Sequence, residues 1–374
     1  MGLGVGVLGL ALAACGSGSS SSTTTTAAAT NWATVTSVQA GGGMNALIAA
    51  AKKEGQLNVV ALPPNWANYG ELISTFQSTY GIKVNSQNPD GSSAQELAAL
   101  TAEKGTSKEP DVVDVGPSFA LLGAQKGLFA PYKVQEWSQI PSNAKAANGD
   151  WYFDYGGYIS IGYNADAFGA NPPTSFASLL QPQYKGAVAL NGNPTSAGAA
   201  FGAVYAAALA NGGSLSNIQP GLDYFKQLNA AGNFVPVQSS PAVIESGQIK
   251  VNIDWDYLNS AYAQAVKGKV NWKVFIPSNA KYASYYAQAI SANAADPAAA
   301  RLWEEFLYSN VGQNLWLKGL ARPILLPTMQ ANGTANATYL ASLPAVSGNP
   351  VFPTSAQLAA AQTLVANQWP TISG

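Results

Sequence analysis

Short apolar segments alternate with amphipathic segments along most of this sequence, and that alternation restricts its fold more than any other feature. Residues 57–62 and 111–115 have the length and apolar character of β-strands, and 82–84 begin another. Helices are expected at 44–54, 69–80, 95–104 and 118–125, the last capped by Ser118. Strands joined by helices pair in parallel, so the pattern predicts an α/β fold with mainly parallel sheets flanked by helices.

The alternation resumes after residue 157, which predicts a second α/β unit. Gly156 and Gly157 precede the first strand of this unit and are candidates for a hinge. We expect strands at 158–163, 187–190, 248–253, 270–276 and 285–291, and helices at 199–210, 222–231, 257–266 and 296–310. Ligands of such folds bind beyond the carboxyl ends of the strands, which here are followed by the loops 63–69, 116–119, 193–198 and 254–257.

The N-terminus has the order of a secretion signal. Residues 3–12 are apolar and too short to span a membrane as a helix, and small residues precede Cys15, the one cysteine of the chain. A Ser/Thr/Gly-rich stretch follows, whose composition is typical of a flexible tether. This order resembles a bacterial lipoprotein signal, which implies that Cys15 is lipidated and anchors the protein to the membrane outside the cytoplasm. No basic residue precedes the apolar segment.

Composition limits both the partners and the chemistry. The net charge of −1 favours neither nucleic acid nor an anionic membrane surface as a partner. Charged residues make up 10% of the chain, against roughly 25% in an ordinary soluble domain, and there is no histidine. Few groups therefore titrate between neutral and mildly acid pH, from which we hypothesise that the protein faces an acidic exterior.

Enzyme signatures are weak. Without histidine, a Ser-His-Asp or Cys-His nucleophile and a histidine metal site are impossible. The spelling G-x-G-x-x-G at 4–9 lies in the apolar N-terminus with no strand before it, and S-x-x-K at 142–145 and 278–281 lacks a companion K-T-G. No phosphate-binding G-x-x-x-x-G-K-[ST] occurs, so ATP hydrolysis would belong to another subunit. We predict a binding protein with no catalytic residue, no cofactor and no metal, rather than an enzyme.

Several stretches in a fixed order resemble one family over about two-thirds of the chain. They are residues 54–59, 76–84, 110–113, 162–164 and 289–294. From residue 52 to about 327 the chain resembles the type II periplasmic-binding fold of bacterial ABC-importer solute-binding lipoproteins. The branch includes spermidine/putrescine-, thiamine-, aminoethylphosphonate- and ferric-iron-binding proteins. The resemblance implies two lobes that close on a small solute, and permease and ATPase subunits as partners; we expect a monomer.

The resemblance and the element pattern together predict five segments. They are a signal peptide (1–15), a tether (16–43), lobe 1 (44–157 with 285–330), lobe 2 (158–284), and a C-terminal helical segment that packs on the lobes (331–374).

Candidate ligand contacts in lobe 1 come mainly from the loop 65–69. Its Asn-Trp-Ala-Asn-Tyr resembles the Asn-Trp-x-Glu-Tyr loop of polyamine-binding proteins, which implies that Trp66 and Tyr69 line the cleft. Asn68 stands where that family has a carboxylate. An aromatic wall holds cations through its ring quadrupole, and the alternative is that Trp66 is a core aromatic. Ser118 follows the strand 111–115 and is a further candidate.

Candidate contacts in lobe 2 are Asp254, Trp255, Asp256 and Tyr257, and Thr195 and Ser196 in the loop 193–198. Residues 254–257 supply carboxylates and aromatic rings. The loop 193–198 precedes a helix, and the free N–H groups at the start of that helix attract anions. In ferric-iron binders the two positions that align with residues 256 and 257 are both tyrosines. In this chain only the second is a tyrosine, Tyr257. Each group also has a structural alternative. Asp254 is typical of a helix start, and Thr195 and Ser196 are typical of helix caps. The alternation of side chains along the strand directs Trp255 into the core.

Together these residues predict a small organic cation or zwitterion as the solute, with a polyamine-like amine favoured. Ferric iron, thiamine, aminoethylphosphonate or another anion remain alternatives within the same fold, as does a ligand sensor in place of a transport receptor.

Overall fold

The computed structural model describes residues 1–4, 6, 30–346 and 352–373. The chain divides into two units, Met1–Thr30 and Asn31–Gly374. Cys15, with most of the predicted signal peptide and the tether up to residue 29, lies outside the described residues. In the described part of the chain, no helix is long and apolar enough to cross a membrane.

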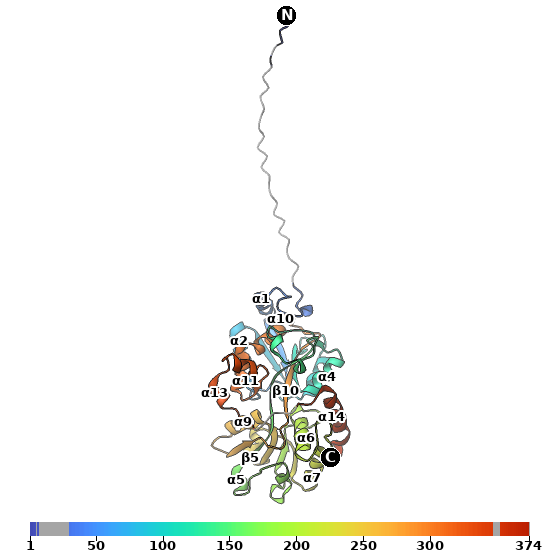
Figure 1. The fold of residues 1–374 in the computed structure, drawn as a ribbon, viewed down its shortest axis with the longest axis vertical. Helices are drawn as coiled ribbons and strands as arrows, with labels where there is room; N and C mark the ends of the chain where they lie inside the picture. The colour runs from blue at the N-terminus through green and yellow to red at the C-terminus, as the bar shows by residue number, and fades with distance from the viewer. Residues whose placement is uncertain (5, 7–29, 347–351, 374) are drawn as a thin grey trace. The chain divides into compact units, whose positions relative to one another are not determined.

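The unit Asn31–Gly374 alternates strands and helices (Figure 1). The strands are β1 (Gln56–Val60), β2 (Lys83–Gln87), β3 (Val112–Val115), β4 (Phe129–Ala130), β5 (Tyr152–Asn164), β6 (Val188–Leu190), β7 (Phe234–Gln238), β8 (Val251–Trp255), β9 (Trp272–Phe275), β10 (Ala283–Ser291) and β11 (Arg322–Pro323). The α-helices are α1 (Met44–Glu54), α2 (Tyr69–Tyr80), α3 (Ser93–Ala102), α4 (Pro117–Gln125), α5 (Ala165–Phe168), α6 (Gly198–Ala210), α7 (Gln219–Ala230), α8 (Pro241–Glu245), α9 (Asp256–Ala265), α10 (Pro297–Tyr308), α11 (Asn310–Lys318), α12 (Leu326–Ala331), α13 (Ala337–Ala341), α14 (Ser355–Gln368) and α15 (Pro370–Ser373).

One long strand, β5, belongs to both sheet halves. The strand order is β2-β1-β3-β10-β5-β8-β6-β7. Residues 152–158 of β5 pair with β10, and residues 159–163 pair with β8. Two α/β lobes result, lobe 1 on β2-β1-β3-β10 and lobe 2 on β8-β6-β7. Each has a parallel part, β2-β1-β3 or β8-β6-β7, and an antiparallel border with β5 or β10, so the sheets are mixed.

Lobe 1 buries one face of α2 against α10. Leu72 and Phe76 of α2 are fully buried, and the Phe76 ring meets Trp303 and Phe306 of α10 edge-on at centroid distances of 5.1 and 5.6 Å. Burial of each such side chain contributes about 1.5–3 kcal/mol to folding. The helix ends where Gly81 takes a φ of 71°, which residues with a Cβ rarely adopt. Its predicted bounds, 69–80, are confirmed.

Lobe 2 is packed around α6, which is buried on nearly all sides. Its small residues let neighbours approach closely: a Cβ at Gly202 would lie 3.0 Å from the Trp255 ring and 3.1 Å from Ile159. On another side, a Cβ at Gly221 of α7 would lie 2.2 Å from the Val204 carbonyl oxygen. The alanine-rich sequence of this helix is therefore a packing requirement, because larger side chains would separate it from the sheet and from α7.

Four sequence expectations are corrected. The strand predicted at 158–163 begins at Tyr152, so Gly156 and Gly157 lie inside a strand. The strand predicted at 248–253 continues through Trp255. Gly116, not Ser118, is the N-cap of α4. The body also starts before the expected end of the tether at residue 43, because Trp32, Val35 and Val38 are buried in the core.

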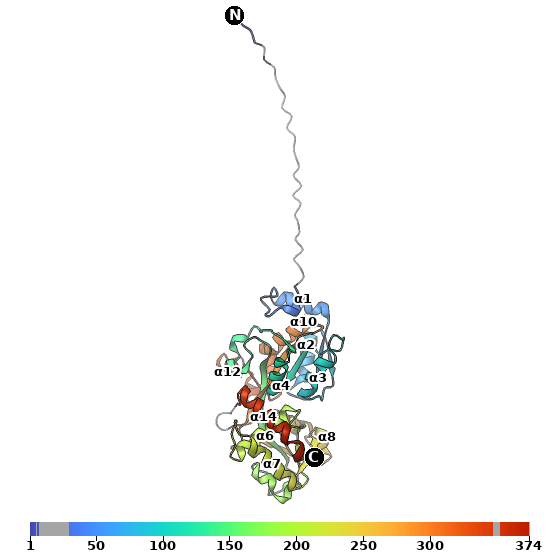
Figure 2. The same cartoon turned by 90° about the vertical axis from the view of Figure 1, so that its right-hand side faces the viewer.

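The C-terminal helix α14 lies between α4 and α6 in both views (Figures 1 and 2). It hydrogen-bonds to lobe 2: Tyr205 donates to the Gln357 carbonyl at 3.1 Å, and the Gln357 amide donates to Ser216 Oγ at 2.8 Å. After it, Asn229 donates to the Ile372 carbonyl at 2.6 Å. Leu358 of α14 and Leu121 of α4 line a common apolar cavity of about 400 Å³, so the segment also contacts lobe 1.

Many of the acidic side chains of this weakly charged chain are buried. Burial raises the pKa of Asp111, Asp254 and Glu305 to about 7. It raises the pKa of Glu96, Asp154 and Glu304 well above the ordinary carboxyl range. These groups bind protons in the folded protein at a pH at which the unfolded chain has lost them.

We predict that the protein is more stable at pH 5 than at pH 7.5. The folded pKa values lie above the unfolded values of roughly 4, so between pH 4 and 7 the folded state binds more protons. Stability is greatest at the acid end of this window and falls as pH rises, by about 1.4 kcal/mol per pH unit for each group. Urea unfolding at pH 5, 6, 7 and 7.5 measures this change in the free energy of unfolding.

Glu304→Gln provides the control, because Glu304 is fully buried and glutamine stays neutral throughout. This variant should show a shallower fall of stability with pH. A wild-type free energy of unfolding that rises from pH 5 to 7.5 would contradict the prediction.

Candidate functional site

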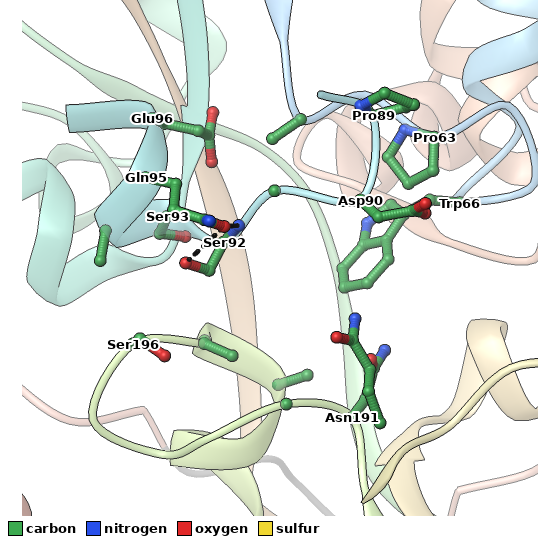
Figure 3. Close-up of a pocket in the computed structure, with 18 of the residues that line it drawn as sticks. Pro63, Trp66, Pro89, Asp90, Ser92, Ser93, Gln95, Glu96, Asn191 and Ser196 are labelled. Carbon is green, nitrogen blue, oxygen red and sulfur yellow. Dashed lines mark hydrogen bonds between the residues drawn. The ribbon is translucent and has the colours of Figure 1, made fainter. Parts of the chain in front are cut away.

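A cleft of about 580 Å³ lies between the two lobes (Figure 3). The lobe 1 wall comes from the loop after β1 and from residues 89–96, which lead into α3. The lobe 2 wall comes from residues 191–193 and 196–199, which follow β6, and from residues 238–241 at the end of β7. Tyr286 of β10 also lines it. The loops after β1 and β6 follow carboxyl ends of parallel strands, where the sequence placed the site.

The cleft side chains are polar but carry no base. Among the described residues that line the cleft there is no lysine or arginine, and the chain has no histidine. Hydroxyl and amide groups come from Asn65, Ser92, Ser93, Gln95, Asn191, Asn193, Ser196, Gln238, Ser239 and Ser240. Such a lining offers many hydrogen bonds to a solute without a fixed positive charge.

Two helices begin at the cleft, one from each lobe. At the start of α3, Gln95 Oε1 accepts a hydrogen bond from Ser92 N at 2.8 Å in a capping box. The N-cap of α6 is Ala197, which has no capping side chain. In Figure 3, Ser92 and Ser93 lie across the cleft from Ser196. The first turn of each helix presents N–H groups and a partial positive charge, so both ends suit an anionic group of a solute.

An aromatic cluster supports the opposite side of the cleft. Trp66 lines the cleft, and its ring contacts Tyr257 of α9 and Tyr286 of β10 edge-on at 6.2 and 5.6 Å. Trp66 Nε1 donates to Tyr155 Oη at 2.7 Å. The indole is thereby fixed in position by lobe 1, lobe 2 and the shared strand β5, and its faces are suited to a cation. Asn191 lies next to Trp66 (Figure 3).

Three acidic residues, Asp90, Glu96 and Asp114, also line the cleft, and the last two are buried. Asp114 lies near the end of β3, and its backbone N–H donates to Glu96 Oε2 at 2.9 Å. Asp114 Oδ2 accepts hydrogen bonds from the hydroxyls of Tyr69 at 2.7 Å and Tyr155 at 2.9 Å. Burial raises the pKa of both carboxyls, and the charge of Asp114 raises that of Glu96 further.

Of the ten residues predicted to contact ligand, Trp66 and Ser196 line the cleft and the other eight do not. Tyr69 is fully buried beneath the wall, where its hydroxyl holds Asp114. Asn68 ties α2 to α11 by donating to the Leu315 carbonyl at 3.0 Å. Ser118 is buried in the first turn of α4. Thr195 donates to Asn193 Oδ1 at 2.8 Å within its own turn.

The predicted lobe 2 group, residues 254–257, lies behind the cleft rather than in its wall. Asp254 is fully buried and accepts from Trp255 N at 2.7 Å. Trp255 is 2% exposed and stacks near Tyr257 and Tyr282. Asp256 accepts from Tyr158 N at 2.8 Å and pairs with Arg322, and Tyr257 is fully buried. The strand continues through Trp255, so the turn that would expose these side chains does not occur.

Most of the polar lining was not predicted from the sequence. Ser92, Ser93 and Glu96 had a detectable signal, since Ser92 with Gln95 has the capping-box spacing directly after a strand. Asp114 had a weaker signal as the polar residue within the strand predicted at 111–115. The loop 238–241 was missed because β7 and α8 were not predicted.

Comparisons with known proteins agree with this geometry. A family model described as bacterial extracellular solute-binding protein matches residues 107–346. No curated protein sequence matches the chain. Similar solved structures include the periplasmic binding protein AfuA from Actinobacillus pleuropneumoniae with exogenous fructose-6-phosphate bound (TM-score 0.67, 19% identity, 85% of this chain and 98% of that chain). Iron-bound HitA from Pseudomonas aeruginosa has a TM-score of 0.62, 18% identity, and coverage of 85% and 99%. An ABC transporter substrate-binding protein from Bradyrhizobium japonicum has a TM-score of 0.65, 16% identity, and coverage of 86% and 100%. At such identities these likenesses show the two-lobe fold and not the ligand.

A buried ion pair connects the lobes behind the cleft. Arg322 of β11, which pairs with the lobe 1 part of β5, forms a salt bridge with Asp256 of α9 in lobe 2. The Asp256 side chain is 0% exposed and that of Arg322 13% exposed. The Arg322 guanidinium also lies over the Tyr158 ring, 4.9 Å from its centroid. Loss of the arginine would leave a buried carboxyl without its counter-charge.

We predict that Arg322→Met lowers the free energy of unfolding by about 3–5 kcal/mol. The matched control is Lys318→Met, which breaks the exposed pair with Glu71 and should cost less than about 1 kcal/mol. Urea unfolding at pH 7 compares the two variants. Equal losses for the buried and the exposed pair would show that the Arg322–Asp256 contact does not hold the lobes together.

Proposed function

Since the chain belongs to the bacterial extracellular solute-binding protein family, it is a receptor that acts outside the cytoplasm, and we propose that its solute is a small zwitterion with a protonated amine and an anionic group. Receptors of this kind deliver their solute to the permease and ATPase subunits of an ABC importer, and the family and its structural relatives are binding proteins.

The observation that carries the solute class is the composition of the cleft walls. The carboxyls of Asp114 and Glu96 and the indole of Trp66 suit a cationic nitrogen. The first turns of α3 and α6 suit an anionic group. A polyamine has no group that would use the two helix ends, so the cleft favours a zwitterion over the polyamine-like amine that the sequence favoured.

We propose that binding works by closure of the lobes, with residues 44–157 and 285–330 as lobe 1 and 158–284 as lobe 2. A solute held by Ser92 and Trp66 on one side and by Ser196 on the other stabilises the closed arrangement through contacts that the open one lacks. We also propose that Cys15 is lipidated and that the protein is a monomer. Cys15 lies outside the described residues.

Ferric iron is a weaker alternative for this cleft. The tyrosine kept at the iron-binding position, Tyr257, is fully buried and does not line the cleft, and Asp256 beside it is paired with Arg322. Iron requires several deprotonated oxygen ligands that converge on one point. Neither residue is placed to supply one to a solute in the cleft.

A phosphorylated polyol is the second candidate, and the serine-rich lining favours it. Five serine hydroxyls, Ser92, Ser93, Ser196, Ser239 and Ser240, line the cleft together with the two helix ends. Hydroxyls of this kind bind sugar hydroxyls, and helix N-termini bind phosphate without a basic side chain. Such a solute would leave the buried carboxyls of Asp114 and Glu96 without a cationic partner.

The first test is a thermal-shift screen of the full chain. The probes are 2-aminoethylphosphonate, β-alanine, glycine betaine, putrescine, spermidine, thiamine, fructose-6-phosphate and ferric citrate. A ligand at 100 times its dissociation constant adds about 2.7 kcal/mol of stability, which raises Tm by a few degrees. We expect the zwitterions to give the largest shifts. A shift with fructose-6-phosphate or ferric citrate alone would overturn the zwitterion and favour the corresponding alternative.

We also predict that Trp66→Ala weakens binding of the best zwitterion from this screen by about 1–2 kcal/mol, roughly 5- to 30-fold, because the indole face is lost. Trp137→Ala is the control, since Trp137 is a partly buried tryptophan that packs on Tyr152 and does not line the cleft. Titration calorimetry measures the affinity of both variants for this solute. Equal affinities in the two variants would remove Trp66 from the site.

A further inference from the structure

Asp114 has one side-chain oxygen satisfied and one without a partner. Its Oδ2 accepts two phenolic hydrogen bonds, from Tyr69 at 2.7 Å and Tyr155 at 2.9 Å. Its Oδ1 is buried and has no hydrogen-bond partner among the described residues. The residue is only 5% exposed, yet it is one of those that line the cleft. A buried carboxyl oxygen without a donor is costly, and a donor supplied by a solute would remove that cost.

The orientation of this carboxyl is fixed from several elements. Tyr69 comes from α2 and Tyr155 from β5, while the Asp114 backbone is held by Glu96 of α3. Gln288 of β10 donates to Tyr69 Oη at 3.0 Å and to Asp154 Oδ2 at 2.9 Å, which supports the phenol from behind. Two donors on Oδ2 set the rotation of the carboxyl group, so Oδ1 is held ready for a third donor.

The same network reaches the aromatic wall. Trp66 Nε1 donates to Tyr155 Oη, and Tyr155 Oη donates to Asp114 Oδ2, so the indole and the carboxyl belong to one hydrogen-bonded chain. Trp66, Asp114 and Glu96 all line the cleft. A carboxyl pair beside an aromatic face is a suitable environment for an ammonium group, which combines three donors with a positive charge.

We propose that Asp114 and Glu96 form a cation subsite, in which Asp114 Oδ1 accepts a hydrogen bond from the ammonium group of the solute and binding releases a carboxyl proton to the solvent. This subsite rests on the proposed function and assigns its cationic half to two residues. No bond of the solute breaks: the ammonium keeps its protons, and the proton released comes from the carboxyl pair.

The groups around Asp114 explain why a proton must leave. Those that interact with it electrostatically are Glu96 on α3, Tyr69 on α2, Asp154 and Tyr155 on β5, Tyr257 on α9, Tyr286 on β10, and Glu304 and Tyr308 on α10. All of them are acids or phenols. Burial raises the pKa of Asp114, and the hydrogen bonds from Tyr69 and Tyr155, which lower it, offset only part of this rise. The empty subsite is therefore protonated at mildly acid pH, and a cationic solute brings the counter-charge that ionises it.

Calorimetry of the full chain with two matched probes tests the subsite. 2-Aminoethylphosphonate carries the ammonium group, and ethylphosphonate lacks it. We expect the wild type to bind the first with release of about one proton at pH 6, measured in buffers of different ionisation enthalpy. Its affinity should rise with pH by up to about tenfold per unit between pH 5 and 6.5. Ethylphosphonate should bind more weakly. Because a phosphonate itself loses a proton near neutral pH, the proton assigned to the carboxyl pair is the difference in release between the wild type and Asp114→Asn with 2-aminoethylphosphonate.

The variants are Asp114→Asn and Glu96→Gln, with Asp254→Asn as the matched control. Asp254 is also fully buried with a raised pKa, but it lies behind the cleft. Asp114→Asn should bind 2-aminoethylphosphonate about 10- to 100-fold more weakly and lose the proton release, and Glu96→Gln should reduce both. Asp254→Asn should change the affinity by less than about threefold. The proton release of the wild type keeps the test valid if Asp114→Asn does not fold.

The cation subsite and the zwitterion receptor can be disproved separately. Tight binding of 2-aminoethylphosphonate without proton release, or with the same affinity in Asp114→Asn, would overturn the subsite and leave the zwitterion receptor standing. Equal affinity for 2-aminoethylphosphonate and ethylphosphonate, or no binding of the first, would overturn both the subsite and the proposed zwitterion.

Discussion

The continuity of β5 through both lobes is the constraint on which the rest of the structure depends. Seven residues of this strand belong to the lobe 1 sheet and the next five to the lobe 2 sheet, so neither lobe can shift without bending it. The crossing is close-packed: a Cβ at Gly156 would lie 2.2 Å from the Ser284 carbonyl oxygen, and one at Gly157 2.4 Å from Asp256 Oδ1. Glycine is required at both positions by proximity. The cleft is the space that this shared strand leaves between two otherwise separate α/β layers.

The electrostatic character of the molecule follows from the scarcity of bases inside it. Arg322 gives Asp256 a counter-charge, and Arg301 donates to the carbonyls of Val35 and Ala33 rather than to a carboxylate. Among the residues that the structure describes, no basic side chain lies at hydrogen-bonding distance from Glu96, Asp154 or Glu304, and burial raises the pKa of all three. A protein built in this way suits an acidic exterior, since the protonated carboxyls that its core requires are favoured there. The sequence expectation that few groups titrate near neutral pH is wrong, because burial raises the pKa of Asp111, Asp254 and Glu305 to about 7. The hypothesis of an acidic exterior therefore rests on the buried carboxyls and not on the missing histidines.

The sequence predicted the helices better than the strands and the loops better than the side chains. The bounds of α1 and α2 follow from helical periodicity closed by Gly55 and Gly81, which is local information. The start of β5 was missed because Asp154 and the two glycines have the composition of a turn, and only the pairing with β10 makes this segment a strand. The loops after β1 and β6 were correctly expected at the cleft, because strand ends fix their position. Which side chains enter the cleft depends on where a strand ends: Trp255 is buried because β8 extends two residues further than expected, so the turn that would expose this side chain does not occur.

Asp114 shows why the chemistry of the site depends on long-range contacts. Within its strand it is one polar residue among valines, and its role arises from phenols 45 and 41 residues away in the chain. One of them, Tyr155, lies on the strand that joins the lobes, and it also accepts the hydrogen bond from Trp66. Trp66 in turn contacts Tyr257 of lobe 2. The indole, the phenol and the carboxyl all belong to lobe 1, so rotation of the lobes leaves this hydrogen-bonded chain intact and changes the contact of Tyr257 with the indole. A solute that binds the chain and also contacts lobe 2 therefore favours the lobe arrangement in which both sets of contacts form.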